Sequence, residues 1–592
     1  MKTKIFLLLI ISLFNTYSVT RYVSKEGSAT PPYLSWTTAA RTIKQCVQVC
    51  QYWDTILVGK GTFKEDTLYL RDNLTLLGSG MDSTIIDIRQ GTVVYFDNNT
   101  IKYFSFLAGD ERFKGIWAAL SSNKLSQNLI FEGNKVINGQ RGLYLTQKGG
   151  TTLIVKNNFF SFSERGIFVS SESSSTKTFI EDNVFNCEVG INISFGGKHL
   201  IENNIFNLMK VSSGVAGGPA YYGGEIGDTS FIKNNIILSE HSSSEGLEMV
   251  GEYAEIENNT FIGKYYLKCI WIGRNALIRN NLLLSLEKNG SAGFKYTYGI
   301  QGNPIINYNL VHNFSVPAYG FTLNNTNLLS DPMVVNQDTF TTFDAHLQKY
   351  SPAIDAGDPT ILDKDGTRSD IGYFGGPGGE SYTYQDLAPR KPRALYGKID
   401  TTKIRLAWKG GTERDFKNFI IYKDTTINFT PDSSKIVSVQ RDTVYIDTFN
   451  PSLEKHYYYK ITAVDSQDNV SLPSQEISFI LLGIKDEEGE LSNGLDYELY
   501  NNYPNPFNPS TSISFRMKKS GFVKLQVYNI AGELVSTIKN EHMEAGYHEV
   551  EYSPKSIDYN DIASGIYILR LDIRGENNVP VYNDSKKMIY MK

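Results

Sequence analysis

The chain lacks the features that would place it in several common classes. Its 592 residues include only four cysteines, so we expect no disulfide framework. Lysine and arginine are scattered and the net charge is -5, so the sequence predicts no basic patch that would bind nucleic acid. Beyond the first 20 residues no apolar run approaches the roughly 18 residues that a membrane-spanning helix needs. The sequence therefore favours neither a nucleic-acid-binding protein nor a helical membrane protein.

The start of the chain predicts export. Lys2 and Lys4 precede an apolar run over residues 5–14, and small and polar residues follow it up to about residue 20. Charge, length and order are those of a secretory signal peptide. We therefore assign residues 1–20 to a signal peptide and expect the protein to leave the cytoplasm.

One short phrase returns throughout residues 132–310, with an asparagine at a fixed place beside apolar residues. The steps between successive copies are 21 to 31 residues, which is the scale of solenoid repeats. The repeated asparagines are Asn134, Asn158, Asn183, Asn204, Asn235, Asn259, Asn281 and Asn309. Each step is expected to be one coil of a solenoid.

Each coil contains two predicted strands with the asparagine between them. The residues before it alternate apolar and polar, as in Ile201-Glu202-Asn203, which indicates a strand with one buried face. We expect the asparagine itself to take a left-handed corner and its amide to bond to the same amide in the coils above and below. A second strand follows, often opened by a glycine such as Gly166. Coils of this kind wind as a parallel β-helix.

At this point the chain resembles the right-handed parallel β-helix superfamily typified by pectate lyases. The resemblance covers about residues 21–380 and rests on the repeat, so it concerns architecture more than activity. A helix behind Thr37 or Thr38 as N-cap, with Ala39, Ile43, Cys46, Val47 and Cys50 on one side, is expected to cover the N-terminal end of the solenoid.

The cysteines are expected to lie in the core. Cys187 and Cys269 belong to coils about 14 Å apart at about 4.8 Å per coil, which no disulfide spans. Cys46 and Cys50 stand four residues apart on the predicted helix, where a bond is geometrically awkward. A paired-thiol metal or redox site is the alternative there.

The outward positions of the second strand form the predicted site. If its apolar residues point inward, their alternating partners form an outward column. The insertion over residues 211–228 adds Tyr221 and Tyr222, and Glu225 is expected to stand beside Glu248. The column members are Tyr144, Phe168, Asn192, Glu248, Trp271 and Lys295.

Three readings of this column stay open. The aromatic rings offer faces for the sugar rings of a polysaccharide, and the charged residues offer contacts to acidic groups. In lyases of the resembled superfamily a basic residue removes a proton beside a uronate and calcium neutralises the carboxylate. That resemblance implies Lys295 or Arg274 as base and Glu225 with Glu248 as calcium ligands, whereas a glycoside hydrolase would use the two glutamates as acid and base. Outward residues without chemistry, as in a surface adhesin or structural protein, are the third reading, and no catalytic signature is present.

The end of the solenoid, residues 351–376, is similar to the closing segment of secreted β-helix proteins. Asp363, Asp365 and Asp370 surround Gly366 there, and short-spaced carboxylates with a glycine turn can wrap calcium. A rigid polar turn is the alternative.

Two small β-sandwiches are expected to follow. Residues 388–482 have short strands about ten residues apart, with Trp408 in one and Tyr457 in a later one, and they resemble a fibronectin type III domain. The acidic composition of residues 483–497 indicates a linker. Residues 498–592 contain the turn YPNPFNP, a hairpin at Gly532, a strand at Gly565 and a basic end. They resemble the C-terminal sorting domain of the Bacteroidetes-type type IX secretion system.

The sequence thus predicts a modular all-β protein. A capped right-handed parallel β-helix is followed by two sandwiches, and the chain is secreted or held at the outer-membrane cell surface by the type IX machinery. We expect a monomer that binds polysaccharide, with lyase or hydrolase activity and calcium as open questions.

Overall fold

The computed structural model places most of the chain. It describes residues 18–89, 94–96, 99–109, 116–120, 128–139, 141–147, 150–161, 165–171, 173–194, 196–208, 221–223, 229–239, 244–249, 253–263, 267–272, 275–286, 292–296, 304–337, 343–400, 403–411, 413–448, 455–480, 483–485, 491–493, 497–502, 505–507, 510–544, 546–554, 563–575 and 579–590. The predicted signal peptide lies almost wholly outside these residues. Two compact units are formed, of which the first comprises Met1–Pro389, Gly411–Phe416 and Asp465–Asn469.

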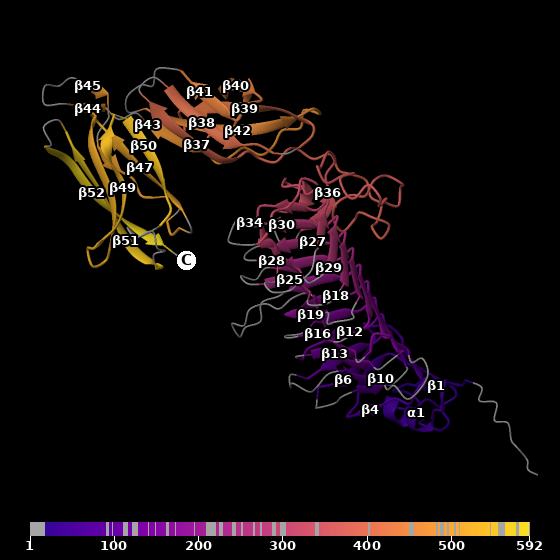
Figure 1. The fold of residues 1–592 in the computed structure, drawn as a ribbon. Coiled ribbons are helices and arrows are strands. Elements are labelled where there is room, and N and C mark those ends of the chain that lie inside the picture. The colour runs from indigo at the N-terminus through magenta and orange to yellow at the C-terminus, as the bar shows by residue number, and fades with distance from the viewer. Residues whose placement is uncertain are drawn as a thin grey trace, which may run out of the picture. The chain divides into compact units, whose positions relative to one another are not determined.

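The first unit is a parallel β-helix, as predicted (Figure 1). Its coils run through three sheets in turn, and every strand pairs in parallel with the corresponding strands of the neighbouring coils. Sheet 1 holds β1 (Thr20–Val23), β2 (Thr55–Val58), β5 (Thr75–Gly78), β8 (Thr100–Lys102), β11 (Asn128–Glu132), β14 (Thr152–Lys156), β17 (Lys177–Glu181), β20 (Lys198–Glu202), β23 (Thr229–Lys233), β26 (Tyr253–Glu257), β29 (Asn275–Arg279) and β32 (Ile305–Asn307).

The other two sheets follow the asparagine corner. Sheet 2 holds β3 (Gly61–Lys64), β6 (Thr84–Ile88), β9 (Ser105–Ala108), β12 (Lys135–Ile137), β15 (Phe159–Ser161), β18 (Val184–Cys187), β21 (Ile205–Leu208), β24 (Ile236–Ser239), β27 (Thr260–Gly263), β30 (Leu282–Ser285) and β33 (Leu310–His312). Sheet 3 holds β4 (Leu68–Tyr69), β7 (Val94–Phe96), β10 (Ile116–Leu120), β13 (Arg141–Gln147), β16 (Arg165–Ser171), β19 (Val189–Ser194), β22 (Tyr221–Gly223), β25 (Ser244–Met249), β28 (Leu267–Ile272), β31 (Ala292–Tyr296) and β34 (Val316–Tyr319).

The repeated asparagines form the predicted ladder. In the coil of Asn204 the side-chain amide donates to Ile180 O at 2.8 Å in the coil before and to Asn235 Oδ1 at 3.0 Å in the coil after. Its own Oδ1 accepts from the backbone and side-chain nitrogens of Asn183. The same contacts recur along the asparagine ladder. They extend it to Asn327, which the repeat did not predict. Each amide is therefore fully bonded although it is buried.

The left-handed corner lies one residue earlier than predicted. Asn157, Asp182 and Asn203 have positive φ, and each directly precedes a ladder asparagine. The same position holds Gly133 and Tyr308 in other coils. The expectation that the ladder asparagine itself takes the left-handed conformation was wrong, because its amide must point inward to bond to the adjacent coils.

The interior between the sheets is a continuous apolar core. It runs from Val23 to Phe314. Part of it is a ladder of phenylalanines in sheet 2, where the rings of Phe160 and Phe185 stack at 5.1 Å and those of Phe185 and Phe206 at 4.8 Å. Successive coils therefore repeat both a polar and an apolar contact at fixed positions.

The single α-helix of the described residues, α1 (Ile43–Val49), is shorter than predicted. Its N-cap is Thr42, whose hydroxyl oxygen accepts from Gln45 N at 3.1 Å, and not Thr37 or Thr38. Ala40 instead pairs with β1 through backbone hydrogen bonds, which excludes it from a helix. Ile43, Cys46 and Val47 are buried as expected. The role of α1 as a cap stays a prediction.

The closing segment runs back along the corner between sheets 1 and 2. It follows the hairpin of β35 (Val334–Asn336) and β36 (Asp344–Leu347). Asn234, Asn258 and Asn280 donate from their side chains to residues 369–375 of this segment. Three successive coils are thereby tied to it.

The rest of the chain forms two pairs of antiparallel sheets within the predicted spans 388–482 and 498–592. The first pair contains β37 (Arg393–Asp400), β38 (Lys403–Lys409), β41 (Val444–Asp447), β39 (Phe416–Asp424), β40 (Ile436–Gln440), β42 (His456–Asp465) and β43 (Ile477–Ile480), with the 3-10 turn η1 (Ser433–Lys435). The second contains β46 (Glu498–Leu499), β47 (Thr511–Met517), β50 (Gly546–Tyr552), β48 (Gly521–Asn529), β49 (Leu534–Met543), β51 (Gly565–Arg574) and β52 (Pro580–Tyr590). The predicted linker holds a short hairpin of β44 (Gly483–Lys485) and β45 (Leu491–Asn493). The domain boundaries stay predictions.

Within the described ranges, no helix is both long and apolar enough to cross a membrane.

Replacing Asn204 by alanine should lower the free energy of unfolding of the β-helix by about 2–5 kcal/mol. The substitution removes the side-chain partner of three backbone groups, Asn183 N and Ile180 O in the coil before and Glu202 O in its own coil, and each unpaired buried group costs about 1–3 kcal/mol. The measurement is the midpoint of urea unfolding followed by circular dichroism. Asn207→Ala, in the same coil but half-buried and bonded to Asn186, is the control and should cost under about 1 kcal/mol. Equal midpoints for the two variants would contradict the ladder's role.

Candidate functional site

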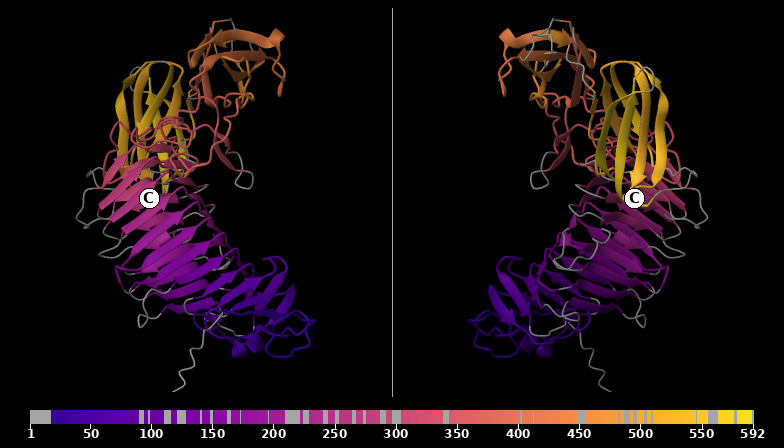
Figure 2. Two further views of the ribbon diagram at one scale, coloured as in Figure 1. Left: turned by 90° about the vertical axis from the view of Figure 1, so that its right-hand side faces the viewer. Right: turned by 90° about the vertical axis from the view of Figure 1, so that its left-hand side faces the viewer.

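The candidate site lies on the outer face of sheet 3, whose strands β13, β16, β19, β25 and β28 are labelled in Figure 1, and Figure 2 shows the stacked coils from two further sides. The alternation predicted there is confirmed where side chains are described. Leu143 and Leu145 are buried while Tyr144 between them is half-buried, and Ile167 and Val169 flank Phe168 in the same way. Asn192, Glu248 and Lys295 are also half-buried. Sheet 3 therefore points one set of side chains into the core and the other outward.

Backbone register aligns these outward positions in one line, which we name the aromatic column. Each member is the Cα partner of the next, from one coil to the following one. Its eleven positions, of which eight are aromatic, are Tyr69, Tyr95, Trp117, Tyr144, Phe168, Asn192, Tyr222, Glu248, Trp271, Lys295 and Tyr319. At about 4.8 Å per coil the column is about 48 Å long.

The register corrects one prediction about the column. The position beside Glu248 belongs to Tyr222, and not to Glu225 as expected. Tyr221–Gly223 is the regular third strand of its coil, so the long step between Asn204 and Asn235 is partly ordinary strand and not all inserted loop. Glu225 and Arg274 lie outside the described residues. In register, a tyrosine therefore stands next to Glu248.

The described rings of the column are accessible. Tyr69 and Tyr319, near its two ends, are 64% and 55% exposed. Tyr144 and Phe168 stack on each other with centroids 4.6 Å apart and an angle of 12° between their planes. The register partner of Phe168 in the following coil is Asn192. Large exposed aromatic side chains aligned on one face are typical of a binding surface.

The charged members stand between aromatic ones. Glu248 lies between Tyr222 and Trp271 in register, and Lys295 lies between Trp271 and Tyr319. The two charged positions are therefore two coils, or about 10 Å, apart. A carboxylate accepts hydrogen bonds and an ammonium group donates them, so together they can bind hydroxyl or carboxylate groups of a polar ligand.

The predicted calcium loop is held together by its own hydrogen bonds. Asp363 accepts from the backbone nitrogens of Asp370 and Gly376, and Asp365 accepts from the backbone and hydroxyl of Thr367. Asp370 accepts from Asp355 N at 2.9 Å and from the hydroxyl of Tyr384 at 2.8 Å. These contacts fix turns of the closing segment. Calcium binding here stays a prediction.

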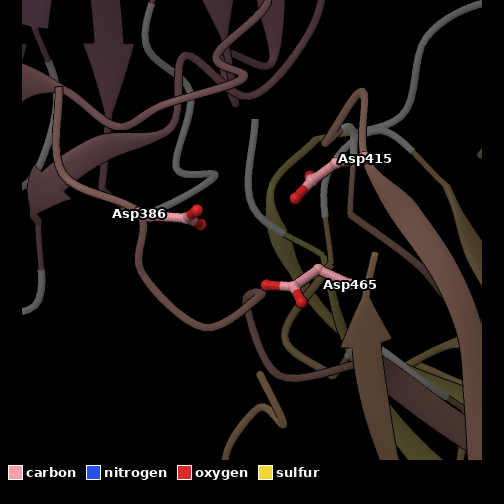
Figure 3. Close-up of side chains that lie close together, drawn as sticks. All are labelled: Asp386, Asp415 and Asp465. Carbon is pink, nitrogen blue, oxygen red and sulfur yellow. The ribbon is translucent and has the colours of Figure 1, made fainter. Parts of the chain in front are cut away.

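Another acidic group lies in the first unit. Asp386, Asp415 and Asp465 each offer a carboxylate oxygen within 4.8 Å of the others, so they could hold a metal ion (Figure 3). Protein groups already satisfy two of them. Lys349 Nζ lies 3.3 Å from Asp386, and Asp465 accepts from the backbone nitrogens of Gln467 and Asn469. Burial, and then the charges of Asp465 and Asp386, raise the pKa of Asp415.

Sequence reasoning missed four members of the column, namely Tyr69, Tyr95, Trp117 and Tyr319. Tyr69, Tyr95 and Trp117 lie in coils without a clear copy of the asparagine phrase, and Tyr319 follows the last named asparagine, Asn309, in a coil whose third strand was not predicted. The signal was nevertheless present, because an aromatic residue stands between small or apolar neighbours in Leu68-Tyr69-Leu70 and Ile116-Trp117-Ala118.

Raising the pH from 4 to 7 should destabilise the closing segment through Asp370. Burial raises the pKa of Asp370 to about 6, from an ordinary value near 3.8. Between these values the folded chain keeps a proton that the unfolded chain loses, so stability falls as pH rises and the loss, about 3 kcal/mol, is complete above pH 6. In Asp370→Asn this titration is absent. Its melting temperature relative to the unmodified chain should therefore rise between pH 4 and pH 7.

Asp365→Asn in the same turn is the control for this prediction. Hydrogen bonds from Thr367 lower the pKa of Asp365, so this carboxylate stabilises the fold at neutral pH and the control should shift in the opposite direction. A melting difference for Asp370→Asn that does not change with pH would contradict the assignment.

Two family models match parts of the chain. Residues 72–236 match the model of the right-handed beta helix region, and residues 501–581 match that of the secretion system C-terminal sorting domain. No curated protein matches the sequence.

Several solved structures share limited similarity with the chain. Dimeric latent PorU from Porphyromonas gingivalis is 15% identical, with 34% of this chain and 20% of that chain covered and a TM-score of 0.17. The twitchin kinase region from C. elegans is 14% identical, with 22% and 29% covered and a TM-score of 0.15. The FN1–FN3 domains of chicken CNTN1 are 12% identical, with 34% and 67% covered and a TM-score of 0.13.

The fibronectin type III assignment of residues 388–482 stays a prediction. The two family matches agree with the coils and with the C-terminal sandwich described above, and the sorting domain directs secretion by the type IX system to the cell surface or extracellular space. The chain is a β-solenoid protein with a right-handed β-helix region and a type IX secretion sorting domain at its C-terminus.

Proposed function

We propose that this secreted protein binds an extended polysaccharide along the aromatic column of sheet 3. The observation that carries the proposal is the unbroken backbone register of eleven positions, eight of them aromatic, over about 48 Å. A straight line of contacts with the same spacing in each coil suits a linear polymer better than a compact ligand.

The chemistry of the column supports a sugar chain as the polymer. Aromatic side chains combine a large apolar face with a small cost in conformational freedom, and tyrosine and tryptophan add a hydrogen-bonding group. Sugar rings also have apolar faces bordered by hydroxyl groups. Glu248, Lys295 and Asn192 stand at register positions from which donors and acceptors would meet such hydroxyls.

Binding, without turnover, is the activity that the geometry favours. A lyase or hydrolase of the expected kind needs a second carboxylate or a base close to Glu248, and within the described part of the chain the register partners of Glu248 are Tyr222 and Trp271. Delivery by the sorting domain would bring the column to glycans outside the cell. The protein would then act as an adhesin or glycan-holding protein of the cell surface.

Replacing Phe168 by alanine should weaken glycan binding about 2- to 10-fold. Loss of one stacked aromatic contact costs about 0.5–1.5 kcal/mol, and about 1.4 kcal/mol corresponds to a factor of ten in Kd. A glycan array first identifies a bound polysaccharide, and calorimetry with that glycan then compares the variants. The matched control is Phe179→Ala, since Phe179 is a half-buried outward residue of sheet 1 in the next coil.

The two variants separate a role for the column from general damage. Phe179→Ala should bind the glycan as the unmodified chain does. The free energy of unfolding of each variant should stay within about 1–2 kcal/mol of that of the unmodified chain. Equal weakening by both substitutions, or no bound glycan on the array, would refute the proposal. Release of unsaturated or reducing sugar ends from the bound glycan would replace simple binding with catalysis.

Deletion of residues 500–592 should abolish secretion. The deleted part contains the matched sorting domain, while the β-helix has its own core and ladder. Immunoblots of periplasm and culture medium measure the outcome, and a deletion of residues 388–480 serves as control for chain shortening. Undiminished export of the chain without residues 500–592 would contradict the role of the domain.

A further inference from the structure

Two cysteines meet at the N-terminal end of the β-helix. Cys46 lies in α1, Cys50 is the residue at which this helix ends, and both are fully buried. The thiol of Cys50 donates to the carbonyl oxygen of Cys46 at 3.2 Å, and each thiol is the first cause of the shift in the other's pKa. The two sulfur atoms are therefore neighbours.

Cys46 and Cys50 stand four residues apart, which is awkward for a disulfide within a regular helix, but the helix ends at Cys50. Residues four apart on a helix have Cα atoms about 6 Å apart, which is within the range of about 4.4–6.8 Å that disulfides span. Cys50 has ψ of 149° and its N–H bonds to Val47 O, so it does not belong to a regular helical turn. The backbone at Cys50 can thus adjust without breaking the helix before it.

The surroundings shift the pKa values of the two thiols in opposite directions. The hydrogen bond from Cys46 lowers the pKa of Cys50, and the nearby guanidinium of Arg21 adds to this effect. The same hydrogen bond and burial raise the pKa of Cys46. Arg21 is held by Asp54, which also accepts from the backbone of Gln51 and so fixes the chain directly after Cys50. A thiolate with a lowered pKa is the attacking group in disulfide exchange.

We propose that Cys46 and Cys50 form a disulfide bond in the exported protein, made as the N-terminal coil folds. The Cys50 thiolate attacks a low-molecular-weight disulfide, which releases one small thiol and leaves a mixed disulfide on Cys50. The Cys46 sulfur then attacks the Cys50 sulfur and releases the second small thiol. Two protein thiols are oxidised and one small disulfide is reduced to two small thiols. Each small thiol takes up one of the two protons that Cys46 and Cys50 release. Oxidising conditions outside the cytoplasm favour this outcome.

Mass spectrometry of the secreted chain tests the bond. The chain is denatured in iodoacetamide without reductant and digested with trypsin, which leaves both cysteines in the peptide of residues 45–60. This peptide should carry no alkyl group and be lighter than the dithiol by two hydrogen atoms. Prior reduction should add two alkyl groups to it.

The chain contains its own control. All four cysteines are free thiols in this structure, but Cys187 and Cys269 lie in different sheets of the core, so both should be alkylated with or without reduction. In Cys46→Ser the thiol of Cys50 should become alkylated, or linked to a small thiol, without reduction. Alkylation of both Cys46 and Cys50 in the unreduced chain, or a bond from either of them to another chain, would overturn the proposal.

Discussion

Each ladder asparagine bonds to backbone groups of its own coil and of the coil before, and to the side chain of the asparagine in the coil after, and this shared hydrogen bonding fixes how the coils stack. Asn204 reaches Ile180 in the coil before, Glu202 in its own coil and Asn235 in the coil after. An unpaired amide at such a buried position would be costly, so the asparagine can lie at only one register. The stacked phenylalanines of sheet 2 impose the same register from the apolar side.

The outer face of sheet 3 depends on that register. Because side chains alternate along a strand, a slip of one residue would turn the aromatic positions into the core and the isoleucines into solvent. Every aligned coil adds one position to the column, from Tyr69 to Tyr319. The asparagine ladder at the corner between sheets 1 and 2 thereby keeps the aromatic column on sheet 3 continuous. The closing segment, tied to Asn234, Asn258 and Asn280, secures the last coils of the stack.

Much of this architecture could be predicted from the sequence, because the repeat itself encodes it. The period, the buried faces and the amide ladder all follow from where the asparagines and isoleucines stand. The corner conformation was wrong by one residue, since the phrase does not tell which of two adjacent polar residues turns left-handed and which bonds inward. The placement of Glu225 failed for a related reason. Spacing alone cannot show how many residues of a long step leave the sheet, and Tyr222 is the residue that stays in it.

The candidate site was predictable only in its middle coils. Tyr144, Phe168 and Trp271 stand in coils marked by clear asparagines, whereas Tyr69 and Trp117 needed the strand pairing to join them to the same line. The hydrogen bonds of Asp363, Asp365 and Asp370 also depend on tertiary contacts that no local motif specifies. The spacing of the three carboxylates alone does not show these donors.

The dependence of affinity on the length of the ligand tests the central claim most directly. Calorimetric titration with oligosaccharides of increasing length, cut from a polysaccharide that the protein binds, measures it. A column of equally spaced contacts predicts that affinity rises with each added sugar until the chain spans the aromatic positions, and then levels off. Affinity that is already complete with a disaccharide would contradict the account, because it would mean a single compact site and not an extended surface.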